Sequence, residues 1–256
     1  MLEQPMRQCP NCKEYVPAEY VVCVWCGYDL TRDIEQELKK KGVKLSWIEA
    51  LRRIWRVIRY PFEGIKEVSV FPDKKGPILI LYIFSFLLTL QLNILIWKAR
   101  YVTNQKYALW VGIIFQALYP FILLVLMMIG VAIISRLIYF VVNVLGGKTE
   151  KNAVNTLLVY SLSPLLITEG IATFLRLFYS KVEIDPITYT TVSNAFASWA
   201  NSGLTVFINI IRIIGWIWAG FLFAYGLKRN AKISYFESGF VTVVFWAIAL
   251  STMFAF

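Results

Sequence analysis

The sequence contains no histidine and few charged residues. Of its 256 residues none is His and 16% are charged, whereas soluble domains carry roughly a quarter charged residues. Without an imidazole the chain can build neither a Ser–His pair nor a histidine-ligated catalytic metal. The aspartates also lie outside the long apolar blocks, which excludes a paired intramembrane aspartate site; they are Asp29, Asp33, Asp73 and Asp185. We therefore predict that the protein is not an enzyme.

Apolar residues dominate the composition. They make up 58% of the chain, and the mean hydropathy is +0.61. About 20 apolar residues cross a ~30 Å hydrocarbon core, and five blocks of roughly this length or more occur: 77–97, 110–145, 153–175, 204–227 and 238–256. The second block has only Pro120 and Gly130 as helix breakers, so it predicts one long, tilted or kinked helix. The sequence thus predicts an all-α polytopic membrane protein with a bundle of five transmembrane helices.

Basic residues gather before the first apolar block. Residues 1–38 hold 3 Lys or Arg against 7 Asp or Glu, whereas residues 39–75 hold 11 against 4. Such an excess beside a span marks the cytosolic side and attracts anionic lipid headgroups of the bilayer. It predicts a cytosolic N-terminus and, with five spans, a C-terminus outside. The basic loop 98–107 then falls outside, as an exception to the rule.

All four cysteines lie within the first 26 residues. They form two Cys-x-x-Cys pairs separated by ten residues: Cys9, Cys12, Cys23 and Cys26. Two such turns can place four thiolates in a tetrahedron around one ion, and four sulfurs leave no open position for catalysis. We interpret residues 1–30 as a zinc ribbon with a structural Zn²⁺. Two disulfides, four unpaired thiols or iron in the same cage are the alternatives.

The ribbon has aromatic residues but an acidic balance of charge. Tyr15, Tyr20, Trp25 and Tyr28 lie close to the cysteines. Because a segment with more acids than bases lacks the phosphate-neutralising charge that nucleic-acid binding needs, we predict no nucleic-acid partner. The aromatics are expected to form the small core of the ribbon and a surface for a cytosolic or membrane protein.

A charged linker, residues 31–44, leads to an amphipathic segment within residues 45–75. Ser46 and Glu49 have the spacing of a capping box, and tryptophans and arginines then recur at helical spacing. This pattern is typical of a helix that lies in the membrane interface. The predicted membrane-interface residues are Trp47, Leu51, Arg52, Arg53, Trp55, Arg56 and Arg59. The alternative is a helix packed on the ribbon or on the bundle.

Several polar residues occur inside the apolar blocks. The intramembrane polar candidates are Asn93, Gln116, Glu169, Asn209 and Arg212. Counted from the outer ends of their blocks at 1.5 Å per residue, Glu169 and Arg212 fall at similar depth. An unpaired charge at such depth is costly, so we predict an ion pair between them in the outer half of the membrane. Asn93, Gln116 and Asn209 fall at similar outer depth and are candidates to complete a polar cluster with the pair. The alternative is that each charge reaches the outer interface separately.

Two short motifs, one at residues 73–77 and one at residues 160–164, resemble those of the Yip family. The members of this family are Ypt/Rab-interacting membrane proteins with a cytosolic N-terminus and five spans. Asp73-Lys74-Lys75-Gly76-Pro77 is similar to the Asp-Leu-Tyr-Gly-Pro motif before the first span of that family, with the middle pair replaced. Tyr160 and Pro164 match Gly-Tyr-x-x-x-Pro in the third span, without its glycine. The family-motif residues are therefore Asp73, Gly76, Pro77, Tyr160 and Pro164. A ribbon joined to a Yip-like domain looks like a prokaryotic, particularly archaeal, arrangement.

The resemblance implies a five-span membrane domain over residues 76–256 and a role in membrane trafficking, in which a small GTPase is the partner of eukaryotic members. Together with the ribbon, it favours a membrane scaffold or adaptor that recruits a protein partner on the cytosolic face. The intramembrane polar residues support a second hypothesis, in which the protein is a transporter, a channel or an accessory transport subunit.

Overall fold

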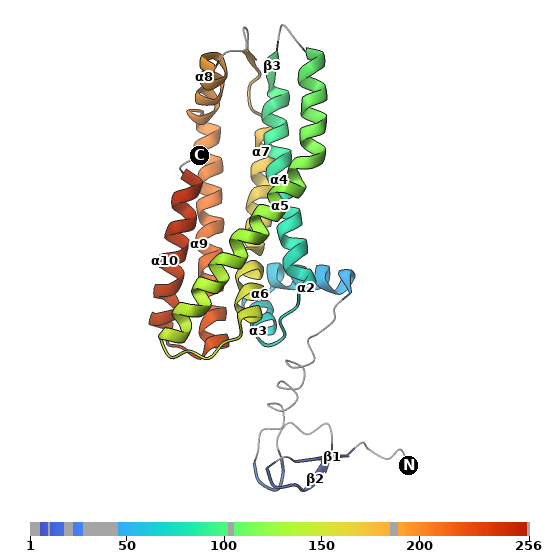
Figure 1. The fold of residues 1–256 in the computed structure, drawn as a ribbon, viewed down its shortest axis with the longest axis vertical. Helices are drawn as coiled ribbons and strands as arrows, with labels where there is room; N and C mark the ends of the chain where they lie inside the picture. The colour runs from blue at the N-terminus through green and yellow to red at the C-terminus, as the bar shows by residue number, and fades with distance from the viewer. Residues whose placement is uncertain are drawn as a thin grey trace.

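The computed structural model describes residues 6–9, 11–17, 23–27, 46–101, 105–184 and 189–254. The longest helices stand side by side as an elongated bundle (Figure 1). In the cysteine-containing segment, the strands β1 (Met6–Gln8) and β2 (Tyr15–Pro17) pair antiparallel. The predicted charged linker, residues 31–44, lies outside the described residues.

Two helices precede the first long helix of the bundle. α2 (Trp47–Arg59) begins with the predicted capping box, in which the Ser46 hydroxyl accepts from the Glu49 N–H and the Glu49 carboxylate accepts from the Ser46 N–H. α3 (Pro61–Val70) follows at once, with Pro61 in its first turn. α4 (Lys75–Lys98) runs along the bundle, whereas α2 lies across the bundle end (Figure 1).

The second apolar block forms one helix, as predicted. α5 (Gln105–Val144) has 40 residues and contains Pro120. Proline removes one helical hydrogen bond and clashes with the preceding turn, which bends a helix. Figure 1 shows this helix bent between a segment that runs along the bundle and a segment that crosses it obliquely.

The third apolar block is divided into two helices instead of forming one. α6 (Lys151–Ser161) and α7 (Ser163–Arg176) meet at Leu162. The reason is Pro164, which occupies the first turn of α7 and disfavours a continuous helical backbone before it.

The last two helices return along the bundle. α9 (Gly203–Ala231) starts at a Ser202 cap and ends at Lys232, and α10 (Tyr235–Phe254) follows. At the opposite end of the bundle, β3 (Ala99–Tyr101) pairs in parallel with β4 (Val182–Ile184), beside α8 (Tyr189–Ala200) (Figure 1).

Four helical segments of the described chain are long and apolar enough to cross a membrane: Lys75–Lys98, Ala117–Val144, Lys151–Arg176 and Gly203–Ala231. They coincide with the first four predicted blocks, so the protein is an integral, multi-pass membrane protein. α10 covers most of the fifth predicted block, residues 238–256, and its role as a fifth span stays a prediction.

The bundle buries its core and leaves a broad apolar surface outside. Tyr160, Phe223 and Leu157 are fully buried where α6 and α9 meet. α5 exposes a series of large aliphatic and aromatic side chains, among them Phe121 and Leu126. Exposed apolar surface of this extent is expected where lipid is the solvent.

Candidate functional site

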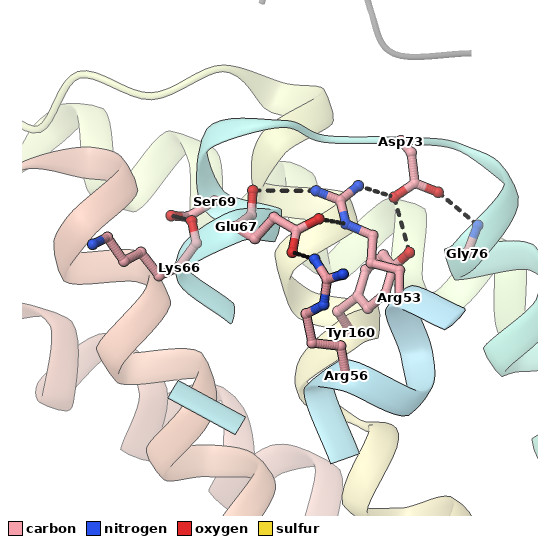
Figure 2. A network of polar contacts seen from close by, with 8 residues as sticks. All are labelled: Arg53, Arg56, Lys66, Glu67, Ser69, Asp73, Gly76 and Tyr160. Atoms are coloured by element: carbon pink, nitrogen blue, oxygen red, sulfur yellow. Dashed lines mark hydrogen bonds and ion pairs between the residues drawn. The ribbon is translucent and has the colours of Figure 1, made fainter. Parts of the chain in front are cut away.

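A buried ion pair joins α2 to the start of the first span. Nη1 of Arg53 lies 2.8 Å from Oδ1 of Asp73, and the two residues are only 5% and 4% exposed. Arg53 is on α2, and Asp73 is in the connection between α3 and α4 (Figure 2). Removing one partner of a buried pair costs ~3–5 kcal/mol, because the other charge is left buried and uncompensated. The pair therefore determines where the surface helix docks on the bundle.

The Asp73 carboxylate also accepts hydrogen bonds from groups on α4 and α6. The Tyr160 hydroxyl donates to Oδ1 at 2.9 Å, and the Gly76 N–H donates to Oδ2 at 2.7 Å (Figure 2). The Thr156 hydroxyl donates to the Asp73 carbonyl at 3.0 Å. A Cβ on residue 76 would lie 1.9 Å from the Tyr160 oxygen, so this close approach requires glycine. The carboxylate therefore joins three segments that are far apart in the sequence.

Glu67 of α3 forms an outer layer around the pair. Its carboxylate lies 3.4 Å from Nε of Arg53 and 2.5 Å from Nη1 of Arg56. Its carbonyl accepts from Nη2 of Arg53 at 3.2 Å. Because Arg56 is 57% exposed at its side chain, its ion pair is solvated and contributes little stability. The strength of the network therefore lies in Arg53 and Asp73.

The prediction that Arg53 belongs to the membrane-interface surface is wrong. The buried stripe of α2 consists of Ala50, Arg53, Ile54 and Val57, and it packs against the bundle. The signal was present in the sequence, since Arg53 falls at i+3 from Ala50 and four before Val57. The remaining predicted interface residues are exposed: Trp47, Leu51, Arg52, Trp55, Arg56 and Arg59. The helix thus packs on the bundle by one stripe and exposes tryptophans and arginines on the rest.

The structure brings three of the five family-motif residues together at this network. Asp73, Gly76 and Tyr160 are in direct contact, and Pro77 is buried in the first turns of α4. Pro164 lies apart from the network and sets the α6–α7 junction. The motif in the first span and the motif in the third span therefore form one site.

The four cysteines gather in the N-terminal segment. Their Sγ atoms all lie within 4.8 Å of one another, with 3.7 Å between Cys9 and Cys26 and 3.6 Å between Cys12 and Cys23. None of the four forms a disulfide, so the alternative of two disulfides is not the arrangement in this structure. The cluster is compatible with a metal site.

Each Cys-x-x-Cys turn ends in a left-handed residue. Lys13 and Gly27 have φ of 63° and 70°, and their N–H groups donate to the carbonyls of Cys9 and Cys23. Glycine adopts this conformation without strain, whereas lysine does so at a cost.

A second polar network lies within the bundle. Nη2 and Nε of Arg212 lie 2.7 and 3.1 Å from Oε2 of Glu169, so the predicted ion pair is present. Gln91 of α4 donates to the same oxygen at 2.8 Å and accepts from Nη2 of Arg212 at 3.1 Å. Glu169 is fully buried.

Two other predicted members of this network, Asn93 and Asn209, make no hydrogen bond to it among the described residues. Asn93 donates to the Thr89 carbonyl of its own helix, and Asn209 is half-buried on α9 without a hydrogen bond to the described network. Gln116 is on α5, but its side chain lies outside the described residues. Gln91 supplies the amide instead.

These features define a multi-pass helical membrane protein whose first span is tied to a surface helix by a buried ion pair. The chain belongs to the Yip family, because the Yip1 domain matches residues 55–256. Searches of curated proteins and of solved structures found no match. The match contains Asp73, Gly76 and Tyr160, and it begins two residues after Arg53. The cysteine segment lies outside it.

Proposed function

We propose that this protein is an integral membrane scaffold with a Yip-like role in membrane organisation or trafficking, which displays a zinc ribbon on the cytosolic face and recruits a protein partner there. The observation that carries the proposal is the buried Arg53–Asp73 pair, which fixes an exposed amphipathic helix to one end of the bundle; this helix is the first described helix after the cysteine segment in the sequence. A surface helix in a defined position and a separate recruitment module are what a scaffold needs, and no catalytic group is required for this role.

A structural Zn²⁺ suits the cysteine cluster best. Four sulfurs at about 2.3 Å from one zinc ion are ~3.8 Å apart in a tetrahedron, close to the separations of 3.6 and 3.7 Å in the thiol cluster. Four thiolates leave no position for water, so the ion would stabilise the ribbon and supply no chemistry. The segment is too short to fold on a hydrophobic core alone, which supports a need for metal.

The exposed face of α2 supports contact with the bilayer. Trp47 and Trp55 are 52% and 62% exposed, and Arg52 and Arg59 flank them. Tryptophan and arginine on one helix that lies across a bundle end suit a position among anionic headgroups. With this end in the cytosol and an odd number of spans, the C-terminus lies outside.

The partner is expected to bind the ribbon by apolar contact. Tyr15, Val24 and Trp25 are all more than half exposed, next to the cysteine turns. The acidic balance of residues 1–38 favours a protein with a basic surface over a nucleic acid. A small GTPase is the candidate that membership of the Yip family suggests.

Cross-linking in native membranes tests the scaffold. We expect a partner captured by the full chain to be lost with Cys9→Ser/Cys12→Ser and with Trp25→Ala. Trp97→Ala is the matched control, because Trp97 is an exposed tryptophan at the other end of α4. Capture of the same proteins by all variants would contradict recruitment through the ribbon.

A transport role is the second candidate, and one observation favours it. Oε1 of the fully buried Glu169 has no hydrogen-bond partner among the described residues, although Oε2 accepts three hydrogen bonds. Such an oxygen suits a passing proton or cation. Ion flux in reconstituted vesicles that is lost with Glu169→Gln would favour transport over the scaffold.

A further inference from the structure

A cavity of about 450 Å³ opens at the bundle end that carries α2 and α3. Its walls come from α3, α6, α9 and the connection between α5 and α6, and its volume is in the range of small-molecule sites. Two of the lining residues are lysines, Lys148 and Lys232, and one is acidic, Glu150. The walls therefore carry a net positive charge.

The two lysines are held close to one junction. The N–H of Lys148 donates to the carbonyl of Ala231 at 3.0 Å, which joins the α5–α6 connection to the end of α9. Gly147 permits this approach, because a Cβ there would lie 2.7 Å from side-chain atoms of Ile233 and Val142. Lys232 follows Ala231 directly. The backbones of the two lysines are thus held close together, and both residues are exposed.

Neutral hydrogen-bonding groups line the same cavity. Asn230 is oriented by two contacts, in which its Nδ2 donates to the Ser69 carbonyl at 2.8 Å and its Oδ1 accepts from the Thr149 hydroxyl. The Asn230 amide carries a second N–H, and Asn143 supplies another amide to the lining. Cations together with amide donors are the groups that bind phosphate oxygens.

The backbone of Lys232 gives an independent indication. Its φ of 57° is in the left-handed region, at the residue that ends α9. Glycine is the usual residue in this conformation, and lysine is strained there. A lysine could simply neutralise the helix C-terminus, but Lys228 and Arg229 already do so from the last turn. The strained backbone of Lys232, on the wall of a cavity, suggests that its side chain binds a ligand there.

We propose that this cavity binds a phosphate-bearing anion through Lys148 and Lys232. The source is either a lipid headgroup or a soluble phosphate ester, since both present the same oxygens. Its position at the ends of the spans suits a headgroup, because basic pockets between helices at a membrane surface bind phosphorylated lipids. The inference is independent of the ribbon and of the scaffold role.

The full chain in nanodiscs distinguishes the two sources. In discs of phosphatidylcholine with a minor share of phosphatidylinositol 4-phosphate, native mass spectrometry measures the retained lipid. In phosphatidylcholine discs, calorimetry measures binding of inositol trisphosphate. Retention of the lipid without binding of the soluble ester assigns the site to a headgroup, and binding of the soluble ester assigns it to a soluble ligand. Absence of both overturns the proposal.

Substitutions then locate the site. Lys148→Gln and Lys232→Gly should each weaken binding about fivefold, as expected for ~1 kcal/mol per lysine at a membrane surface. Lys232→Gly should also raise the melting temperature, because it relieves the backbone strain, and Lys232→Asn is a second variant that suits the left-handed backbone. Glu150→Gln should strengthen binding. A purely structural Lys232 would leave binding unchanged.

The matched control is Lys151→Gln. Lys151, the first residue of α6, is an exposed lysine three residues after Lys148 that does not line the cavity. If Lys151→Gln weakens binding as much as Lys232→Gly does, the attraction is a diffuse surface charge and the proposed site is wrong.

Discussion

Replacing Arg53 with methionine tests the ion pair on which the scaffold proposal depends. Methionine fills a similar volume but leaves the Asp73 carboxylate buried, with hydrogen bonds from Tyr160 and Gly76 alone. Removing one partner of a buried pair costs ~3–5 kcal/mol, because the remaining charge has lost its compensation. Asp73→Asn still leaves Glu67 beside Arg53, so we expect a smaller cost of ~2–3 kcal/mol for this variant.

The double variant should be more stable than either single variant. With Arg53→Met and Asp73→Asn together no uncompensated charge remains, since the asparagine oxygen can accept from the Gly76 N–H and its amide can donate to the Tyr160 hydroxyl. We expect the double variant to lose ~1–2 kcal/mol, so the two sites should be coupled by ~3 kcal/mol or more. Additive single effects would refute the reasoning.

Hydrogen exchange of the α2 amides is the direct assay. If α2 (Trp47–Arg59) detaches more easily by ~3 kcal/mol, exchange of its amides should accelerate about a hundredfold, at 1.4 kcal/mol per factor of ten. Arg56→Met is the matched control, and it should cost less than ~1 kcal/mol because its ion pair is solvated. Equal acceleration in the two variants would show that the burial of Arg53 does not matter.

Three further predictions concern the metal, the second ion pair and the topology. The purified chain should contain about one zinc per molecule. Chelation or Cys9→Ser/Cys12→Ser should release the zinc and unfold the ribbon without unfolding the spans, as circular dichroism can verify. Unchanged metal content in the variant would disprove the assignment. Glu169→Gln and Arg212→Met should each destabilise the bundle by several kcal/mol and should be strongly coupled in a double-mutant cycle, whereas independent effects would mean that the pair carries no energy. Single cysteines at the two chain ends of a cysteine-free variant should be labelled from opposite sides of the membrane, and labelling from one side would require an even number of spans.

The spans and the cysteine site could be predicted because their signals are local. An apolar run of more than twenty residues has few alternatives to a membrane helix, and two isolated helix breakers in 110–145 were too few to predict a turn between two spans. Four cysteines at this spacing likewise define their own cluster. Pro164 was visible in the sequence as a helix breaker. Whether it would bend the third span or divide it into α6 and α7 depended on the packing of these two segments.

The partners of polar residues were harder to predict, because depth does not determine the face of a helix. Counting residues was enough to match Glu169 with Arg212. It selected Asn93 for the same network, yet Gln91 is the residue that joins it. At 3.6 residues per turn, Asn93 lies about 200° around the helix from Gln91 and points elsewhere. Arg53 posed the same problem, because α2 contains four arginines and only the position of Asp73 determines which of them forms the buried ion pair.

The network also explains in physical terms which parts of the first-span motif this chain shares with its family. Asp73 and Gly76 are both buried. The Asp73 carboxylate is a charged acceptor shared by Arg53 and Tyr160. Gly76 lies so close to the Tyr160 ring that a side chain does not fit there. The middle pair that differs is on the outside, where Lys74 is exposed and Nζ of Lys75 lies 5.4 Å from the centre of the Trp47 ring. Substitution of this pair therefore leaves the ion pair intact and changes the surface beside α2. In this chain the outer residues of the motif therefore connect the surface helix to the spans, and the middle pair lies on the surface beside α2.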